Sequence, residues 1–91
     1  MERRFDWDPN KAARNLEKHG ISFVVAANVF DDPDVLITPD DRFNYGEVRK
    51  KATGRVGVSM LTVIYTEREG LTRLISARKA RKDEREKYGR P

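Results

Sequence analysis

Residues 58–66 read Val58-Ser59-Met60-Leu61-Thr62-Val63-Ile64-Tyr65-Thr66. Apolar side chains occur on both alternating sets of positions between 60 and 65. β-Branched and aromatic residues are common here, which favours an extended strand. A strand that is apolar on both faces is typical of the middle of a sheet. We therefore predict that residues 58–66 form the central strand of the fold.

The neighbouring strands are delimited by turn residues. The segment 54–57, Gly-Arg-Val-Gly, predicts a hairpin loop that joins a strand over residues 47–53 to the central strand. The segment 68–70, Arg-Glu-Gly, predicts a second turn before a strand over residues 71–77. Short strands are predicted over residues 3–7 and 35–38. Because short turns connect antiparallel neighbours, we predict an antiparallel sheet.

Helix signals stand before these strands and after them. Asp8-Pro9 predicts the start of a helix that ends at His19, because Gly20 suits the left-handed cap position. Ser22 predicts the cap of a second helix, with apolar residues at 23, 26, 27 and 30 on one face. A charged helix is predicted over residues 79–88. The expected fold class is α+β, with two N-terminal helices packed on one face of the sheet and one C-terminal helix. Residues 1–91 should form a single domain.

Charge is distributed unevenly along the chain. Residues 1–45 hold six Lys and Arg against nine Asp and Glu, a net charge of −3. Residues 46–91 hold thirteen against six, a net charge of +7, which favours a nucleic acid or an acidic protein as partner. The sequence has no cysteine, no apolar signal-peptide core and no run long enough for a membrane span, so a cytoplasmic protein is expected.

The sequence lacks the residues that several classes of active site require. One histidine and no cysteine do not make a usual zinc site, and neither a phosphate-binding glycine loop nor a G-x-S-x-G segment occurs. The aspartates at 31, 32 and 34 are read as a loop that stops a helix. We therefore expect no metal ion and no cofactor. Arginine and carboxylate side chains can cleave RNA without a metal, because the RNA 2′-hydroxyl is the nucleophile and guanidinium groups bind the phosphate.

The candidate residues cluster in the predicted strands. Strict alternation puts Arg73 and Arg78 on opposite faces of one strand, so both line one site only if that strand ends or bulges near Ala77. Each arginine can equally be a surface ion pair. His19 can transfer protons or cap the first helix. The catalytic candidates are Arg73, Arg78, Arg49, Glu47 and His19, and the RNA-binding candidates are Lys18, Arg55 and Lys79.

In order along the chain, these motifs resemble the BrnT family of toxins. The resemblance is carried by Phe5-x-Trp7-Asp8-x-x-Lys11-x-x-x-Asn15-x-x-Lys18-His19-Gly20-Ile21-x-Phe23-x-x-Ala26, Val29-Phe30-Asp31-Asp32-Pro33, Tyr45-Gly46-Glu47-x-Arg49, Val63-x-Tyr65-Thr66, Arg73-x-Ile75-Ser76-Ala77-Arg78-x-Ala80 and Glu84-Arg85-x-x-Tyr88. One departure is the pair Lys50 and Lys51, which stand where apolar residues are expected and leave the register of Arg49 open.

The resemblance implies a RelE-like fold and a ribonuclease toxin that arrests growth by blocking translation. It also implies a BrnA-like ribbon-helix-helix antitoxin as partner, with operator DNA contacted through that antitoxin. The alternative function is a non-catalytic basic module that binds RNA or the antitoxin. Cleavage of RNA by the isolated protein in the presence of a chelator would distinguish the two.

Overall fold

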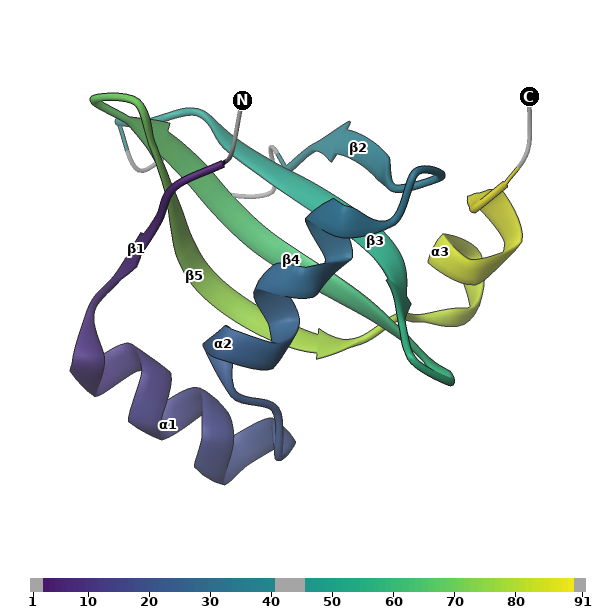
Figure 1. Cartoon of the computed structure of the whole chain (residues 1–91), viewed down its shortest axis with the longest axis horizontal. Coiled ribbons are helices and arrows are strands. Elements are labelled where there is room, and N and C mark those ends of the chain that lie inside the picture. Colours follow the sequence, from purple (N-terminus) through teal and green to yellow (C-terminus); the bar gives the residue numbers. More distant parts are fainter. Residues whose placement is uncertain (1–2, 41–45, 90–91) are drawn as a thin grey trace.

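The computed structural model describes residues 3–40 and 46–89, which form an α+β fold around one five-stranded sheet (Figure 1). The strands follow the order β1-β5-β4-β3-β2 across the sheet. Their bounds are β1 Phe5–Trp7, β2 Leu36–Pro39, β3 Arg49–Val56, β4 Ser59–Arg68 and β5 Leu71–Lys79. The prediction that residues 58–66 form the central strand is confirmed, because β4 has two strands on either side.

The prediction of a purely antiparallel sheet is wrong, because β1 pairs with β5 in parallel. The other neighbouring strands are antiparallel. Two helices separate β1 from the next strand, so no tight turn dictates the direction in which β1 docks. The sheet is therefore mixed.

The hairpin between β3 and β4 is tighter than predicted. Gly54 and Arg55 belong to β3, and only Gly57 and Val58 form the turn. Gly57 has a φ of 61°, the left-handed region that favours glycine. A Cβ atom on Gly54 would lie 2.9 Å from the Val29 carbonyl oxygen, so this glycine serves close packing against a helix and not the turn.

A bulge in β5 changes which residues share a face. Ile64 pairs with Ser76, whereas the next residue, Tyr65, pairs with Leu74, so Ile75 has no partner on β4. One extra residue reverses the alternation of side chains along a strand. Leu74 and Ala77 therefore both reach the core although they are three residues apart. Arg73 and Arg78 consequently lie on the same face, opposite the core.

The first two helical segments begin at the predicted caps, Asp8 and Ser22, whereas the predicted helix over residues 79–88 is shorter than expected. α1 spans Pro9–His19, where Asp8 accepts a hydrogen bond from the Asn10 N–H and Gly20 ends the helix at φ 70°. α2 spans Phe23–Ala26 and continues as the 3₁₀ helix η1, Ala27–Asp31. α3 spans Lys82–Lys87, because β5 extends as far as Lys79. Within the ranges 3–40 and 46–89, no helix is long and apolar enough to cross a membrane.

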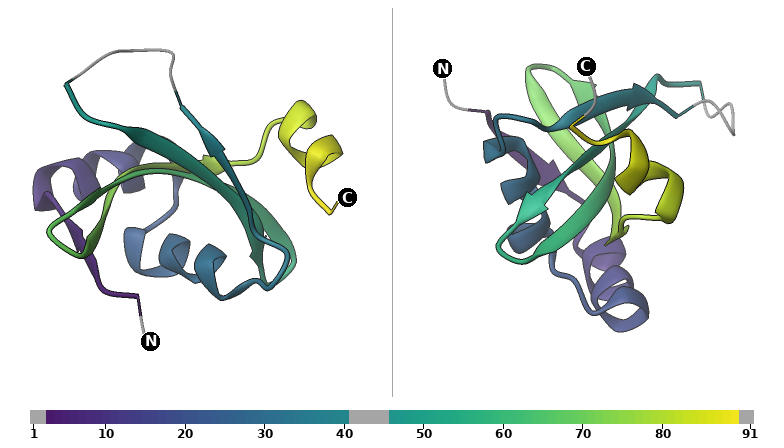
Figure 2. Two further views of the ribbon diagram at one scale, coloured as in Figure 1. Left: turned by 90° about the horizontal axis from the view of Figure 1, so that it is seen from above. Right: turned by 90° about the vertical axis from the view of Figure 1, so that its right-hand side faces the viewer.

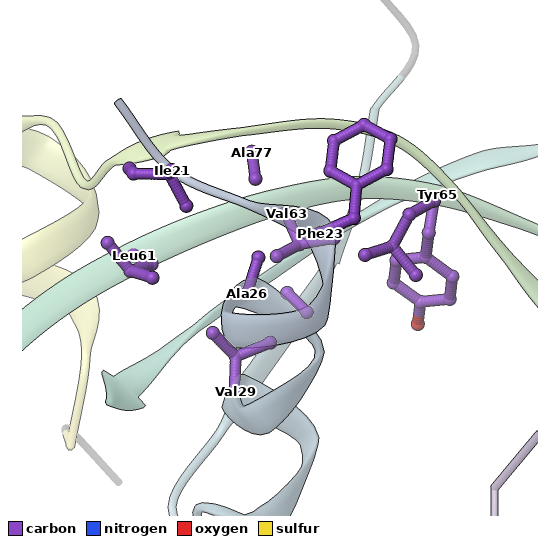
Figure 3. Close-up of a cluster of buried hydrophobic side chains, with 10 residues drawn as sticks. Ile21, Phe23, Ala26, Val29, Leu61, Val63, Tyr65 and Ala77 are labelled. Atoms are coloured by element: carbon purple, nitrogen blue, oxygen red, sulfur yellow. The ribbon is translucent and has the colours of Figure 1, made fainter. Parts of the chain in front are cut away.

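The core lies between the sheet and the N-terminal helices. α2 and η1 pack against β3, β4 and β5 on one face, α1 lies along β5, and α3 stands apart from them near the far end of the sheet (Figure 2). Figure 3 shows the apolar side chains of α2 and η1 facing those of β4. The Phe30 ring meets the Tyr65 ring edge-on at 5.0 Å, and Trp7 packs edge-on against Phe23 at 5.8 Å. The opposite face, which we call the open face, carries the polar side chains of β3, β4 and β5.

Candidate functional site

One row across the open face contains two of the predicted arginines. Arg49 of β3 and Arg73 of β5 each pair with Thr66 of β4, from its two sides. Paired residues point to the same side of a sheet, so both arginines flank this threonine. Their Cα atoms are about 10 Å apart, which is two strand spacings. Thr66 is itself buried, and its hydroxyl donates to the Val48 carbonyl at 2.7 Å.

Glu47 lies at the β3 end of this row and contacts Arg49. Its carboxylate accepts hydrogen bonds from Arg49 Nε at 3.4 Å and from Arg68 Nη2 at 3.0 Å. Burial raises the pKa of Glu47, but the hydrogen bonds from Arg68 and Arg49 outweigh it, and the net pKa lies below the ordinary value. Glu47 is therefore an ionised proton acceptor at neutral pH.

Arg73 occupies the β5 end of the row and is paired with Asp6. Asp6 is the residue opposite Arg73 in the parallel β1–β5 pairing, and Arg73 Nη1 donates to its carboxylate. A guanidinium group has five N–H donors. The bond to Asp6 uses one of its three nitrogens, so Arg73 keeps donors that can bind a phosphate.

A second cluster on the open face surrounds Arg78 and is separate from the first. Arg78 donates from both Nη atoms to the Glu84 carboxylate of α3, at 2.7 and 2.9 Å. Lys51 Nζ and the Thr62 hydroxyl donate to the same carboxylate at 3.1 and 3.0 Å, and the Arg81 N–H donates at 2.8 Å. Only 12% of the Arg78 side chain and 6% of the Glu84 side chain are exposed. This cluster anchors α3 to the sheet.

The structure thus answers the question of whether Arg73 and Arg78 meet. The bulge at Ile75 brings them to one face, but they are five residues apart along β5, a distance of about 15 Å. Each is bonded to a carboxylate of its own. Arg73 and Arg78 are therefore too far apart to bind one phosphate together in this structure, whereas Arg49, Glu47 and Arg73 share one row.

The structure shows on which face of the sheet Lys50 and Lys51 lie, and this settles the register of Arg49. Lys50 lies opposite Tyr65, on the face that carries the helices, and forms an ion pair with Glu67 at 3.0 Å. Lys51 lies on the open face and reaches Glu84. Arg49 is two positions from Lys51 and therefore also lies on the open face.

The remaining predicted residues lie elsewhere. Lys18, His19 and Lys79 surround the C-terminal end of α1, where His19 lines two adjoining hollows, one together with Lys18 and the other together with Lys79. Arg55 lies at the end of β3, where its N–H donates to Asp32 at 2.7 Å and its guanidinium group faces the Tyr88 ring at 5.7 Å. Arg55 lines neither hollow.

Sequence reasoning missed the partners of the arginines. Asp6 pairs with Arg73, Arg68 pairs with Glu47, and Glu84 pairs with Arg78. In the first two pairs the partners are far apart along the chain. The six-residue separation of Arg78 and Glu84 bridges a strand and a helix, so no helical spacing marks it. Among residues 3–40 and 46–89, no three or more His, Asp or Glu side chains are grouped so that they could hold a metal ion.

The comparisons with known proteins place the chain in a family. A family model described as "Ribonuclease toxin, BrnT, of type II toxin-antitoxin system" matches residues 7–84. A search of curated proteins gave no match. The matched range contains β1 from Trp7 onward, every later strand and the Arg49–Arg73 row, while Tyr45 of the motif lies outside the described residues. The chain therefore belongs to the BrnT family, the ribonuclease toxins of type II toxin–antitoxin systems.

Proposed function

We propose that this chain is a metal-independent endoribonuclease toxin whose reaction takes place at the row of Glu47, Arg49 and Arg73. The observation that carries the proposal is the pairing of both arginines with Thr66, which sets them side by side on one sheet face with an ionised carboxylate. The fold belongs to the proposal as well, since a curved sheet with two helices on one face is the arrangement expected of a RelE-like toxin.

The proposed chemistry uses the nucleophile that RNA itself supplies. Glu47 accepts the proton of the 2′-hydroxyl as its oxygen bonds to the adjacent phosphorus. The bond from phosphorus to the 5′ oxygen breaks, and that oxygen takes a proton from solvent water, while Glu47 returns its proton to the solvent; the products are a 2′,3′-cyclic phosphate and a 5′-hydroxyl. Arg49 and Arg73 stabilise the additional negative charge of the pentavalent transition state. No step requires a metal ion or a cofactor.

Arg78 has a conditional place in this proposal. Both of its Nη atoms are bonded to Glu84 and only 12% of its side chain is exposed, so little of the guanidinium group is open to a phosphate while α3 is docked on the sheet. His19 lies on the other side of the sheet edge and stays a candidate for proton transfer to or from a strand that passes the end of α1.

Cleavage in the presence of EDTA tests the proposal. The purified chain should cut a structured RNA, and Arg49→Gln and Arg73→Gln should each slow cleavage by about 10²–10³. Glu47→Gln should slow it by about 10²–10⁴. Lys82→Gln, a change at an exposed lysine of α3, is the matched control and should cleave like the parent chain. Intact RNA, or full activity in the Arg49→Gln/Arg73→Gln double variant, would refute the assignment.

The partner and the cellular effect are part of the same proposal. A BrnA-like ribbon-helix-helix antitoxin would hold the toxin inactive in the cytoplasm and carry the complex to operator DNA, and release of the toxin would block translation. Expression of the chain alone should arrest growth, and coexpression with the antitoxin should restore it. Growth that continues while the chain accumulates in folded form would contradict this part.

A second function is favoured by the ion pairs themselves. Arg49, Arg73 and Arg78 each contact a carboxylate of this chain, which is also what a non-catalytic module with a stable polar surface would show. Such a module would bind RNA, with a steep salt dependence, and leave it uncut. The cleavage assay above separates the two functions.

A further inference from the structure

Three basic side chains of α1 form no ion pair with a carboxylate among the residues that the structure describes. Lys11, Arg14 and Lys18 stand at i, i+3 and i+7, so they form one stripe along the helix. All three are exposed, and no ion pair involves them among the residues that the structure describes. The open-face arginines differ, because each of them contacts a carboxylate. We call these three side chains the α1 stripe.

The α1 stripe borders a concave surface. A hollow of about 370 Å³ lies between the stripe and the bulged part of β5, with Ile75 and Ser76 on the β5 side. His19 lines one end of this hollow and also lines a second hollow of about 520 Å³, which extends to Lys79. No carboxylate lines either hollow among the described residues. The two hollows meet at His19, and together we call them the trough: the α1 stripe borders the first, while the second is lined mainly by apolar side chains and has Lys79 as its cation.

The trough has a rigid wall. Asn15, which is 6% exposed, donates from Nδ2 to the Ile21 and Ala77 carbonyls at 3.0 and 2.9 Å and accepts from the Ala77 N–H at 3.0 Å. The two bonds to Ala77 join α1 to β5 one residue before Arg78, and the bond to Ile21 ties α1 to the segment that follows it. The cations of the stripe are therefore held at a fixed distance from the strand, which reduces the conformational cost of binding an extended anion.

The trough also leads to the open face. β1 pairs with β5 only as far as Leu74, so beyond that residue β5 is the edge of the sheet and lies beside α1. Ser76 lines the trough and, through its pairing with Ile64, belongs to the open face. A ligand that follows the stripe can pass over this edge toward the row of Arg49 and Arg73.

We infer that the trough binds the phosphate backbone of a single RNA strand and guides it over the β5 edge, an inference that rests on the proposed ribonuclease function. Lys11 and Lys18 are about 10 Å apart along the helix axis, room for about two or three phosphates. Backbone contacts of this kind fix position without reading sequence. An RNA strand fits better than an acidic protein segment, because the trough ends beside the face that holds the proposed reacting groups.

Salt-dependent binding tests the inference. The probe is a 2′-O-methyl RNA 12-mer of mixed sequence, which keeps the phosphates but lacks the nucleophilic hydroxyl, so binding is measured without cleavage. In the variant Lys11→Gln/Arg14→Gln/Lys18→Gln, the slope of log K against log salt should fall by about 2, since each lost contact to a single strand contributes about 0.7. The control variant Arg4→Gln/Lys82→Gln/Lys87→Gln loses the same charge at exposed sites and should keep the slope. Thermal melting checks that both variants are folded.

The outcomes separate the inference from the proposed function. An unchanged slope in the stripe variant, while the parent chain cleaves RNA in EDTA, would overturn the trough and leave the ribonuclease assignment intact. A reduced slope in a chain that cleaves nothing would support the trough and refute the ribonuclease. If the stripe variant binds the 12-mer normally but loses binding to a poly-glutamate peptide, the trough serves an acidic protein segment and the inference is wrong.

Discussion

Replacing Glu84 by alanine should destabilise the protein more than replacing Asp83 or Glu86, the exposed carboxylates of the same helix. The substitution removes a carboxylate that accepts from Arg78, Lys51 and Thr62 and leaves the Arg78 guanidinium, 12% exposed, without its partner. Breaking a buried pair by removing one member costs about 3–5 kcal/mol. For a domain of this size that corresponds to a fall in Tm of roughly 12–40 °C.

The assay can use the single tryptophan. Trp7 packs against Phe23 in the core, so its fluorescence should report unfolding in urea. Glu84→Gln keeps an oxygen acceptor without the charge and should cost about 1.5–3 kcal/mol, which provides a variant that still folds if the alanine variant does not. Glu86→Ala, at an exposed position of the same helix, is the matched control and should change stability by less than about 0.5 kcal/mol.

The stabilisation by Glu84 should decrease at acidic pH, because its pKa is lowered in the folded protein. Burial raises the pKa of Glu84, but the bonds from Arg78, Arg81 and Lys51 dominate and hold it well below its ordinary value of 4.5. A lowered pKa in the folded state means that the stabilisation is complete above pH 4.5 and is lost as the pH falls. The advantage of the parent chain over Glu84→Gln should therefore shrink by about 2 kcal/mol between pH 7 and pH 3. A loss below 1 kcal/mol in Glu84→Ala, or a pH-independent advantage, would refute the reasoning.

Substitutions at three further positions and one binding measurement test other parts of the structure. Asn15→Ala should cost about 2–4 kcal/mol in urea unfolding, because the buried Ala77 backbone loses its partners, and amide exchange at Ala77 should accelerate. Gly54→Ala should cost about 1–3 kcal/mol, because the new Cβ would lie 2.9 Å from the Val29 carbonyl oxygen; a neutral result would mean that η1 shifts freely. Ser22→Ala should cost about 1 kcal/mol through loss of the α2 cap, and Ser22→Gly less than that. Antitoxin at 100 times its Kd should add about 2.7 kcal/mol to toxin stability, and equal melting temperatures with and without it would argue against binding to the folded state.

The sequence by itself determined the elements whose signals are local. The apolar run at 58–66 marks the central strand because a buried strand needs apolar side chains on both faces. The ends of α1 follow from Asp8 and Gly20, since capping is decided by the residues that flank the helix. The α1 stripe was equally visible as i, i+3, i+7 spacing, but its importance was not, because the sequence does not say which cations are already paired.

Only the tertiary structure decided the features that depend on distant segments. The parallel docking of β1 places Asp6 beside Arg73, and 67 residues separate the two along the chain. The bulge at Ile75 turns Arg78 to the face of Arg73, a change of one residue in register that no local pattern announces. Strand alternation predicts the face of a side chain only while the register is unbroken, and the register is set by packing between strands. For this reason the residue types of the site could be read from the sequence, whereas their pairing and their grouping could not.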